Sequence, residues 1–312
     1  MYNIDELEPE KVYDLIILGL GPAGLGCAIY AARFDLDILV IGTEYGGLIT
    51  TTHIVENYPG ITSVSGPELM EMFRDHINSL DIPYITDEIN EIQREKDIFV
   101  LKSFFQSFKA KTVLFATGSE RRKLNIPGEQ KYSGNGVSYC ATCDGPFFKD
   151  KKVAVIGGSD SAAKEALFLA KHAVNVYIIY RRDEIRAEPI NKQRVLDTEN
   201  IELIYNTNIV EIKGDDNVNS VIFDSGEEFK VDGVFIEIGS IPNSDIAEKI
   251  GVKTNEKHEI IINRKSETNI PGVYAAGDVA DAPFKQAITG TAEGVVAAYA
   301  AFDYLKKKNI EY

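Results

Sequence analysis

Two of the three cysteines in this chain, Cys140 and Cys143, lie in the segment SYCATCDGP with two residues between them. A Cys-x-x-Cys pair can be half of a zinc site, a structural pair or a redox-active disulfide. Structural zinc needs four ligands, yet there is no second Cys-x-x-Cys pair and the four histidines lie scattered along the chain. We therefore expect no metal. The third cysteine, Cys27, falls in an alanine-rich segment and is expected to be a small buried hydrophobe.

A glycine-rich turn near the start of the chain has the spacing of a dinucleotide-binding motif. Gly19, Gly21 and Gly24 in GLGPAG fit the pattern G-x-G-x-x-G. The first glycine permits a tight turn, the second lets backbone approach a pyrophosphate, and the third packs helix on strand. The acid usually expected about 20 residues further on is missing after DILVIG, so we expect main chain at Gly46 and Gly47 to take over contacts.

A second turn of this kind lies near the middle of the chain, in the segment GGSDSAAKEA. Gly157 and Ala162 keep the outer positions of the motif, whereas Ser159 occupies the place of the middle glycine. A Cβ and a hydroxyl therefore stand where backbone should touch a phosphate. The hydroxyl could donate a replacement hydrogen bond, so the sequence leaves the strength of this site open.

Three arginines follow the strand after the second turn. Arg181, Arg182 and Arg186 stand where arginines would receive the 2′-phosphate of NADP in place of an acid that receives a hydroxyl. A solvated basic cluster is the alternative. In a chain with a formal net charge of −15, three arginines within six residues favour a phosphate.

A strand must precede each glycine turn and a helix must follow it. Tyr13–Leu18 and Lys152–Ile156 are short apolar runs that predict strands, and each leads through its turn into an alanine-rich helix. Lys111–Ser119 predicts another strand, and Asn269–Asp281 predicts a turn, a strand and a glycine exit. A long helix is predicted over Gln286–Lys306.

Length and composition limit the classes of protein that fit. The 312 residues, 44% of them hydrophobic and 26% charged, exceed one typical core and predict two domains. The net charge of −15 disfavours nucleic acids and anionic membranes as partners. The chain lacks a long apolar run and begins with an acidic segment, so we expect a cytoplasmic protein acting on small molecules and other proteins.

Eight short segments occur together and in order along nearly the whole chain: GLGPAG, TEYGGLITTT, VENYPG, ATGS, SYCATCDG, YRRDEIRA, GVYAAGDV and FKQAITGTAEG. In combination they resemble the low-molecular-weight thioredoxin reductases, which are FAD-dependent pyridine nucleotide-disulfide oxidoreductases. The redox pair just before the second nucleotide turn separates this family from dinucleotide enzymes whose pair lies near the first turn.

The resemblance implies an α/β fold of two Rossmann-like, three-layer nucleotide-binding domains, the second inserted into the first. Residues 1–118 and 246–312 would form the FAD-binding domain, and residues 119–245 the NADPH-binding domain that carries the CATC pair. The junctions at Thr117–Arg121 and Gly239–Ser244 would act as a hinge, because nicotinamide and disulfide must reach one flavin in turn. A homodimer is also implied.

The family's nucleotide contacts carry over to two sets of positions. The FAD-binding set is Gly19, Gly21, Pro22, Ala23, Gly24, Gly46, Gly47, Asn57, Asp278, Gln286 and Ala287. The NADP-binding set is Gly157, Gly158, Ser159, Asp160, Ser161, Arg181, Arg182 and Arg186. Leu48 departs from a glutamine of many relatives, and Ser159 and Tyr180 depart from the usual glycine and histidine. On its spacing alone, Asp278 could instead be an N-cap or turn residue.

The activity that the resemblance implies is thioredoxin-disulfide reduction. A hydride would pass from NADPH to FAD, electrons then to a Cys140–Cys143 disulfide, and dithiol exchange would reduce a thioredoxin-like or glutaredoxin-like small redox protein. Cys143 would lie nearer the flavin and Cys140 would attack the partner. Asp144 would shuttle the proton, although an Asp-Gly pair ahead of Pro146 also fits a turn.

Two alternatives remain open on the sequence. Because of Ser159 and Tyr180, the same fold could take electrons from NADH, ferredoxin or reduced deazaflavin. A flavin-bearing redox sensor could also signal through Cys140 and Cys143 without turnover, although a sensor has no need of two nucleotide sites.

Overall fold

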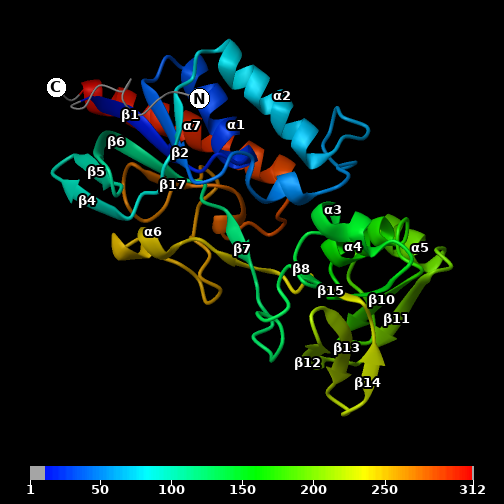
Figure 1. Cartoon of the computed structure of the whole chain (residues 1–312). Helices are drawn as coiled ribbons and strands as arrows, with labels where there is room; N and C mark the ends of the chain where they lie inside the picture. Colours follow the sequence, from blue (N-terminus) through cyan, green and yellow to red (C-terminus); the bar gives the residue numbers. More distant parts are fainter. Residues whose placement is uncertain (1–10, 311–312) are drawn as a thin grey trace. The chain divides into compact units, whose positions relative to one another are not determined.

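The structure is a computed structural model that describes residues 11–310. Residues 1–10 and 311–312, which include the acidic opening segment and both ends of the expected FAD domain, lie outside the described residues. The described chain divides into two compact units (Figure 1). The first unit comprises 11–50, 54–120 and 241–310, and the second comprises 51–53 and 121–240. The second unit is therefore an insertion in the sequence of the first.

The first unit is built on a mostly parallel sheet. Its strands are β1 (Val12–Leu18), β2 (Ile38–Gly42), β3 (Tyr84–Thr86), β4 (Glu91–Glu95), β5 (Ile98–Lys102), β6 (Ser107–Phe115) and β17 (Val273–Ala275). The parallel part has the order β3-β2-β1-β6, with β17 also pairing with β6. β5 and β4 extend the sheet antiparallel from β6. The carboxyl ends of β1 and β17 both lie next to β6, so the segments that follow them meet at one edge.

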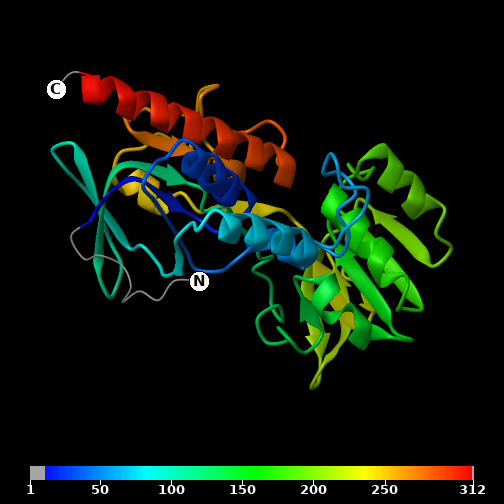
Figure 2. The same cartoon turned by 90° about the horizontal axis from the view of Figure 1, so that it is seen from above.

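Helices cover this sheet. They are α1 (Pro22–Arg33), α2 (Gly66–Ser79), α6 (Asp245–Lys249) and α7 (Ala287–Ile310). Figure 2 shows α1 and α7, drawn in blue and red, side by side. Glycine permits this close approach, because a Cβ at Gly294 would lie 2.0 Å from the carbonyl oxygen of Ala23. An apolar core, which includes Leu15, Ile17 and Leu25, lies between the sheet and the helices α1, α2 and α7. Helix α6 packs on a second apolar cluster, through Ala247.

The second unit has three layers around a parallel sheet. The sheet strands are β8 (Val137–Ser138), β9 (Lys152–Ile156), β10 (Asn175–Tyr180), β11 (Ile201–Tyr205) and β15 (Gly233–Ile236), in the order β11-β10-β9-β15-β8. The helices α3 (Ala141–Asp144), α4 (Asp160–Leu169) and α5 (Pro189–Leu196) lie on one face. The antiparallel strands β12 (Ile209–Gly214), β13 (Val218–Phe223) and β14 (Glu228–Lys230) cover the other face. One apolar cluster lies between the sheet and the helices, and another lies between the sheet and the antiparallel strands.

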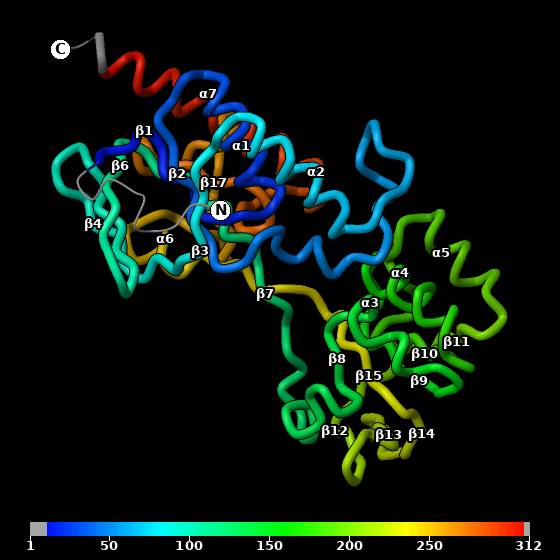
Figure 3. The backbone as a smooth tube through the Cα atoms, turned by 45° about the horizontal axis from the view of Figure 1, so that its top comes forward, coloured from blue at the N-terminus to red at the C-terminus, as the bar shows by residue number. Residues whose placement is uncertain are grey.

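Two paired strands carry the chain between the units. They are β7 (Ser119–Arg121) and β16 (Ser240–Pro242), and Figure 3 traces the tube through β7 and back through the yellow segment near residue 240. Each strand lies next to a glycine with positive φ, Gly118 at +66° and Gly239 at +99°, and nothing lies within 4 Å of a Cβ at either position. The amide of Asn243 donates to the carbonyl of Gly118 at 3.0 Å.

The expected α/β class with two Rossmann-like units is confirmed, and β9 has the predicted bounds. The strand predicted over Lys111–Ser119 instead ends at Phe115, where its pairing with β1 ends, and Ser119 begins β7. The last helix begins one residue later than expected and runs on to Ile310. No described helix has both the length and the apolar character needed to cross a membrane.

Candidate active site

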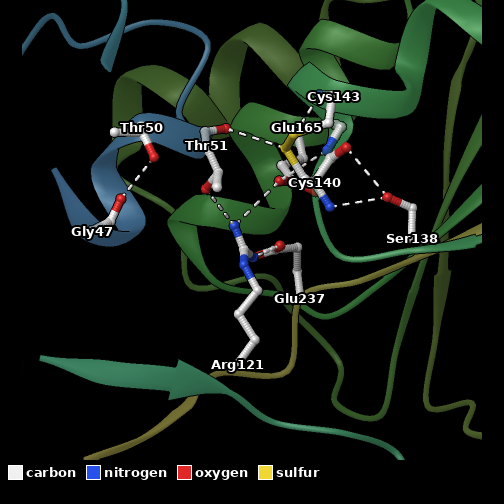
Figure 4. Close-up of a disulfide and its surroundings, with 10 residues drawn as sticks. Gly47, Thr50, Thr51, Arg121, Ser138, Cys140, Cys143, Glu165 and Glu237 are labelled. Atoms are coloured by element: carbon white, nitrogen blue, oxygen red, sulfur yellow. Dashed lines mark hydrogen bonds and ion pairs between the residues drawn. A yellow bond between two sulfur atoms is a disulfide. The ribbon is translucent and has the colours of Figure 1, made fainter. Parts of the chain in front are cut away.

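The Cys140–Cys143 pair is a disulfide in the structure, with the two Cα atoms 5.4 Å apart (Figure 4). Strand β8 ends two residues before Cys140, which is the N-cap residue of α3. The amide of Cys143 donates a hydrogen bond to Cys140 Sγ at 3.2 Å. Since an amide directed at sulfur favours the charged form, this geometry suits a thiolate at Cys140 after reduction.

Ser138 fixes the backbone of Cys140 at the start of α3. Its Oγ accepts the amide hydrogen of Cys140 at 3.0 Å and donates to the carbonyl of Cys140 at 3.3 Å. Ser138 was not among the residues predicted from the sequence, although serine at a strand end commonly forms hydrogen bonds with nearby backbone in this way.

Asp144 is the last residue of α3 and is partly exposed. Its side chain makes no hydrogen bond or ion pair within residues 11–310. Gly145 has helical angles, with φ −51° and ψ −42°, so the Asp-Gly pair continues into a further helical turn and does not form a tight reversal. A partly exposed carboxylate therefore directly follows Cys143.

A buried cluster of charged residues lies beneath α3. Arg121 forms ion pairs with Glu237 and, at 3.8 Å, with Glu165, and Figure 4 shows its guanidinium directed toward both acids. Glu165 Oε1 also accepts the amide hydrogen of Ala141 at 3.4 Å. Burial, and then the charge of Glu237, raises the pKa of Glu165 well above its usual range. Burial likewise raises the pKa of Glu237. The cluster therefore favours a proton held between the two carboxyl groups.

This cluster was not predicted from the sequence. A signal was present for one member, because Glu165 shares a helix stripe with Ala162 and Leu169, both buried. An acid at a core position of an amphipathic helix predicts a buried partner. No local pattern indicated that the partners would be Arg121 and Glu237 from distant segments.

The first glycine turn has two positions that require glycine for internal reasons. Gly19 has φ +126°, and a Cβ there would lie 2.0 Å from the carbonyl oxygen of Ala116. A Cβ at Gly24 would lie 2.0 Å from the carbonyl oxygen of Gly19. These two glycines therefore serve the packing of strand, turn and helix.

The middle glycine of this turn has room for a Cβ. The nearest atom to a Cβ at Gly21 is the carbonyl oxygen of Gly46 at 3.6 Å, and a Cβ at Gly47 would come no closer than 3.8 Å, to Gly21 Cα. Helix α1 begins at Pro22 with no side-chain cap and no acid in its first turn. Its first amides are thus available to an anion, as a pyrophosphate site requires.

A buried carboxyl group lies near this opening. Asp278 follows β17, and burial raises the pKa of its carboxyl group. Its only side-chain hydrogen bond within residues 11–310 comes from Ser119 Oγ at 3.5 Å. The residue before it, Gly277, packs on α1, since a Cβ there would lie 3.0 Å from Ala23 Cβ. A buried acceptor with one long hydrogen bond is suited to receive a ligand hydroxyl.

Residues from opposite ends of the chain complete the expected flavin set. Asn57 Nδ2 donates to Gln286 Oε1 at 3.1 Å, and Ala287 begins α7. The fold of the first unit therefore brings the strand ends, the first glycine turn and the start of α7 together. An open glycine cradle, an uncapped helix and a buried carboxyl group fit a flavin dinucleotide.

The second glycine turn keeps the strained glycine and fills the middle position. Gly157 has φ +149°, and a Cβ there would lie 2.1 Å from the carbonyl oxygen of Glu237. Ser159 is the N-cap of α4, and its Oγ accepts the amide hydrogen of Ala162 at 3.5 Å. The hydroxyl oxygen thus caps its own helix as an acceptor, and the hydroxyl hydrogen can still donate to a phosphate.

Of the other residues in the expected NADP-binding set, some make hydrogen bonds within the protein and others are exposed to solvent. Asp160 is engaged internally, because it accepts from the Glu188 amide and from Asn191 Nδ2, each at 2.9 Å, and pairs with Lys164 at 2.8 Å. Ser161 is exposed. The three arginines after β10 are exposed as well and form no ion pair within the described part of the chain. Open guanidinium groups beside a glycine turn fit a phosphorylated dinucleotide.

The third cysteine and the residues that could bind a metal ion lie elsewhere in the chain. Cys27 is fully buried and unpaired, as predicted, and burial raises the pKa of its thiol. Among residues 11–310, His, Cys, Asp and Glu do not form a group of three or more that could hold a metal ion.

Comparisons with known proteins agree with these features. The model of the pyridine nucleotide-disulphide oxidoreductase family matches residues 13–299. The thioredoxin reductase of Bacillus subtilis (strain 168) is 40% identical over 308 residues, which cover 96% of this chain and 97% of the relative. The crystal structure of Lactococcus lactis thioredoxin reductase matches with a TM-score of 0.91 at 37% identity, covering 95% of this chain and 99% of that one. A ferredoxin-flavin thioredoxin reductase from Clostridium acetobutylicum matches with a TM-score of 0.53 at 34% identity, covering 95% and 98%.

Two nucleotide-binding units with a disulfide just before the second turn define a nucleotide-dependent disulfide oxidoreductase. The chain belongs to the pyridine nucleotide-disulphide oxidoreductase family. The relatives described above are all thioredoxin reductases.

Proposed function

We propose that this protein is an NADPH-dependent thioredoxin-disulfide reductase. It holds FAD on the first unit and NADPH on the second, and it passes electrons through Cys140 and Cys143 to thioredoxin or a similar small redox protein. The observation that carries this proposal is the disulfide at the start of α3, in a unit that also contains a dinucleotide turn. A homodimer in the cytoplasm is part of the same proposal, on the family relationship alone.

A bound flavin supplies the step between a nicotinamide, which gives a hydride, and a disulfide, which accepts two electrons. The first unit would hold it through the backbone at Gly21 and Gly47, where a Cβ has room, and at Gly46, which packs against Thr50 and Met70. Asp278 would accept a hydroxyl hydrogen from the ligand. That contact would offset part of the cost of burying the carboxyl group.

Reduction of the Cys140–Cys143 bond consumes two electrons and one proton, and it leaves one thiol and one thiolate. The amide of Cys143 stabilises the thiolate at Cys140, so that sulfur is the nucleophile toward a partner disulfide. Its attack forms a mixed disulfide and releases the partner's other sulfur as a thiolate. Cys143 then loses its proton, attacks Cys140 Sγ and releases the dithiol partner. Asp144, at the end of α3, is the carboxylate nearest in sequence to accept that proton.

We also propose that the second unit turns about β7 and β16, so that nicotinamide and disulfide reach the flavin in turn. Gly118 and Gly239 support this, because both have positive φ and open space around them. Glycines of this kind can absorb a change in backbone angles. A disulfide or chemical crosslink that joins the two units should abolish turnover, and full activity in the crosslinked protein would contradict the rotation.

Another electron donor is the second candidate. Ser159 caps its own helix and narrows the place where a dinucleotide phosphate would approach. One relative is named for ferredoxin, which makes reduced ferredoxin a specific alternative, with NADH and reduced deazaflavin as others.

Anaerobic mixing of the purified flavoprotein with NADPH, NADH or reduced ferredoxin tests the donor. We expect NADPH to bleach the flavin absorbance and to support continuous reduction of thioredoxin. Bleaching by reduced ferredoxin but not by NADPH would reject NADPH as the donor. Bleaching without continuous reduction of any disulfide protein would indicate a redox sensor. The Cys143→Ser variant is the control, since it should bleach with the same donor and fail to reduce thioredoxin.

A further inference from the structure

The side chain of Tyr180 forms a wall beside the second glycine turn. Tyr180 ends β10 and is buried. A Cβ placed on Gly158 would lie 2.5 Å from the tyrosine ring, so the ring packs directly on the glycine backbone. The phenol oxygen accepts a hydrogen bond from Arg186 Nε at 3.1 Å. One aromatic residue thus contacts both the turn and an arginine six residues later.

The backbone of Arg186 is fixed to the same turn. Its amide donates to the carbonyl of Gly158 at 2.6 Å, and Arg186 pairs with Ser159 in an isolated β-bridge. Arg181 and Arg182 are also exposed, but neither side chain has a hydrogen bond or ion pair within residues 11–310. Among the three arginines, Arg186 alone is held by both its backbone and its side chain in a defined orientation beside the turn.

The bond to Tyr180 leaves the rest of the guanidinium group available. A guanidinium has five N–H donors, and a bond through Nε leaves the four on the two terminal nitrogens, which can bind phosphate in a bidentate manner. No described carboxylate pairs with Arg186: the nearby Glu184 pairs with Lys192, and Asp160 pairs with Lys164. An oriented, unpaired guanidinium loses less conformational entropy on binding than a mobile one.

We propose that Tyr180 is a positioning residue for Arg186 and thereby sets the preference of this protein for a 2′-phosphorylated dinucleotide. The hydroxyl fixes the guanidinium, and the ring fixes the turn. This inference rests on the proposed use of NADPH. It assigns a specificity role to the tyrosine that stands where the family usually has histidine.

Equilibrium binding of two ligands without redox chemistry tests the proposal. Isothermal titration of the holoenzyme with 2′-phospho-ADP-ribose and with ADP-ribose gives the ratio of the two affinities. Tyr180→Phe keeps the ring on Gly158 and removes only the acceptor. We expect it to weaken 2′-phospho-ADP-ribose binding by about tenfold, the effect of one hydrogen bond to a charged group. Binding of ADP-ribose should stay unchanged.

Two further variants separate positioning from general packing. Tyr177→Phe is the matched control, because Tyr177 lies on the same strand but packs edge-to-face on Phe229 in the other core. Its affinity ratio should equal that of the wild type. In an Arg186→Lys background, Tyr180→Phe should cause no further loss, because the bonded partner is already gone.

The outcomes distinguish the two levels of inference. If the wild type prefers the 2′-phosphorylated ligand and Tyr180→Phe leaves the ratio unchanged, or weakens both ligands equally, the role of Tyr180 is wrong while NADPH use stands. If the wild type shows no preference, NADPH specificity fails, and the positioning role fails with it.

Discussion

The two glycine turns of this protein have the same internal geometry and different openings. In each, the first glycine has positive φ and would clash with a carbonyl oxygen if it had a Cβ, that of Ala116 in the first unit and of Glu237 in the second. The middle residue differs: Gly21 leaves room for a Cβ and carries no side chain, whereas Ser159 caps its own helix. This difference shows that folding and ligand binding depend on separate positions of one motif. The first glycine is required for folding, and the middle residue faces the expected ligand.

The largest effect is expected where the two turns agree. Gly19→Ala and Gly157→Ala would each force a Cβ to within about 2 Å of a carbonyl oxygen, at a backbone angle that L-residues rarely adopt. Overpacking and backbone strain together should lower the free energy of unfolding by about 3 kcal/mol in either variant. Denaturant unfolding of both measures it. A large loss in one variant and none in the other would break the equivalence of the turns.

A change at the middle position of the first turn should separate binding from folding. Gly21→Ser has room for its Cβ, and serine is a favourable N-cap, so the free energy of unfolding of the flavin-free protein should not fall. The side chain would fill the place of the pyrophosphate and should weaken FAD binding roughly 100-fold. Fluorescence titration of the flavin-free protein with FAD measures this. Unchanged FAD affinity would show that the opening at Gly21 is not the cofactor site.

The two turns also differ in the residue whose carbonyl oxygen lies next to the first glycine. In the second turn this residue is Glu237, which belongs to the buried acid cluster. In the first turn it is Ala116, which does not. The pKa of Glu165 is raised in the folded state, so its contribution to stability is full below the unfolded pKa of about 4.5 and is lost as pH rises through the folded pKa. Glu165→Gln mimics the protonated form at every pH. The free energy of unfolding of Glu165→Gln minus that of the wild type should therefore rise as the pH rises above about 4.5. The total rise should be about 1.4 kcal/mol for each pH unit by which folding raises the pKa of Glu165.

Urea unfolding of wild type and Glu165→Gln between pH 4 and 8 measures this difference. Glu227→Gln, which removes an exposed carboxylate of the same unit, controls for the loss of a surface charge. A difference that falls as pH rises would mean that the pair with Arg121 outweighs burial, and that Glu165 is charged in the folded protein.

The smallest effect is expected at the middle position of the second turn. Ser159→Gly removes the cap of α4 and should lower the free energy of unfolding by a few tenths of a kcal/mol, whereas Ser159→Ala should cost about 1 kcal/mol. Without the side chain, backbone can approach a phosphate as in the first turn, so NADPH should bind roughly fivefold more tightly to Ser159→Gly. Weaker binding would mean that the serine itself contacts the nucleotide.

The sequence predicted what local chemistry determines. The glycines at 19 and 157, the apolar strands before them and the helices after them follow from backbone angles and short-range periodicity. The sequence could not predict the direction of the Ser159 hydroxyl. The hydroxyl oxygen can accept from the helix while its hydrogen donates elsewhere, and only the path of the first helical turn decides whether the cap forms.

Long-range contacts were also beyond the sequence. Asn57 meets Gln286 from 229 positions away, and this pairing depends on how α7 packs along α1. Arg121 meets Glu165 and Glu237 because three separate segments converge beneath α3. Individual propensities do not encode such convergence, since many arginines and acids in the chain could have paired equally well.

The place where the chain leaves and re-enters the first unit has a consequence for engineering. Gly118 and Asn243 are hydrogen-bonded neighbours, and Thr117 Oγ1 donates to the Asn243 carbonyl at 2.7 Å. Excision of residues 121–240 would therefore leave two ends already in contact, which a bridge of very few residues could join. Residues 121–240 are contiguous in sequence, so one gene fragment would encode all of the second unit except residues 51–53. The corresponding stretches of relatives could thus be exchanged here without breaking a strand of the sheet in the first unit.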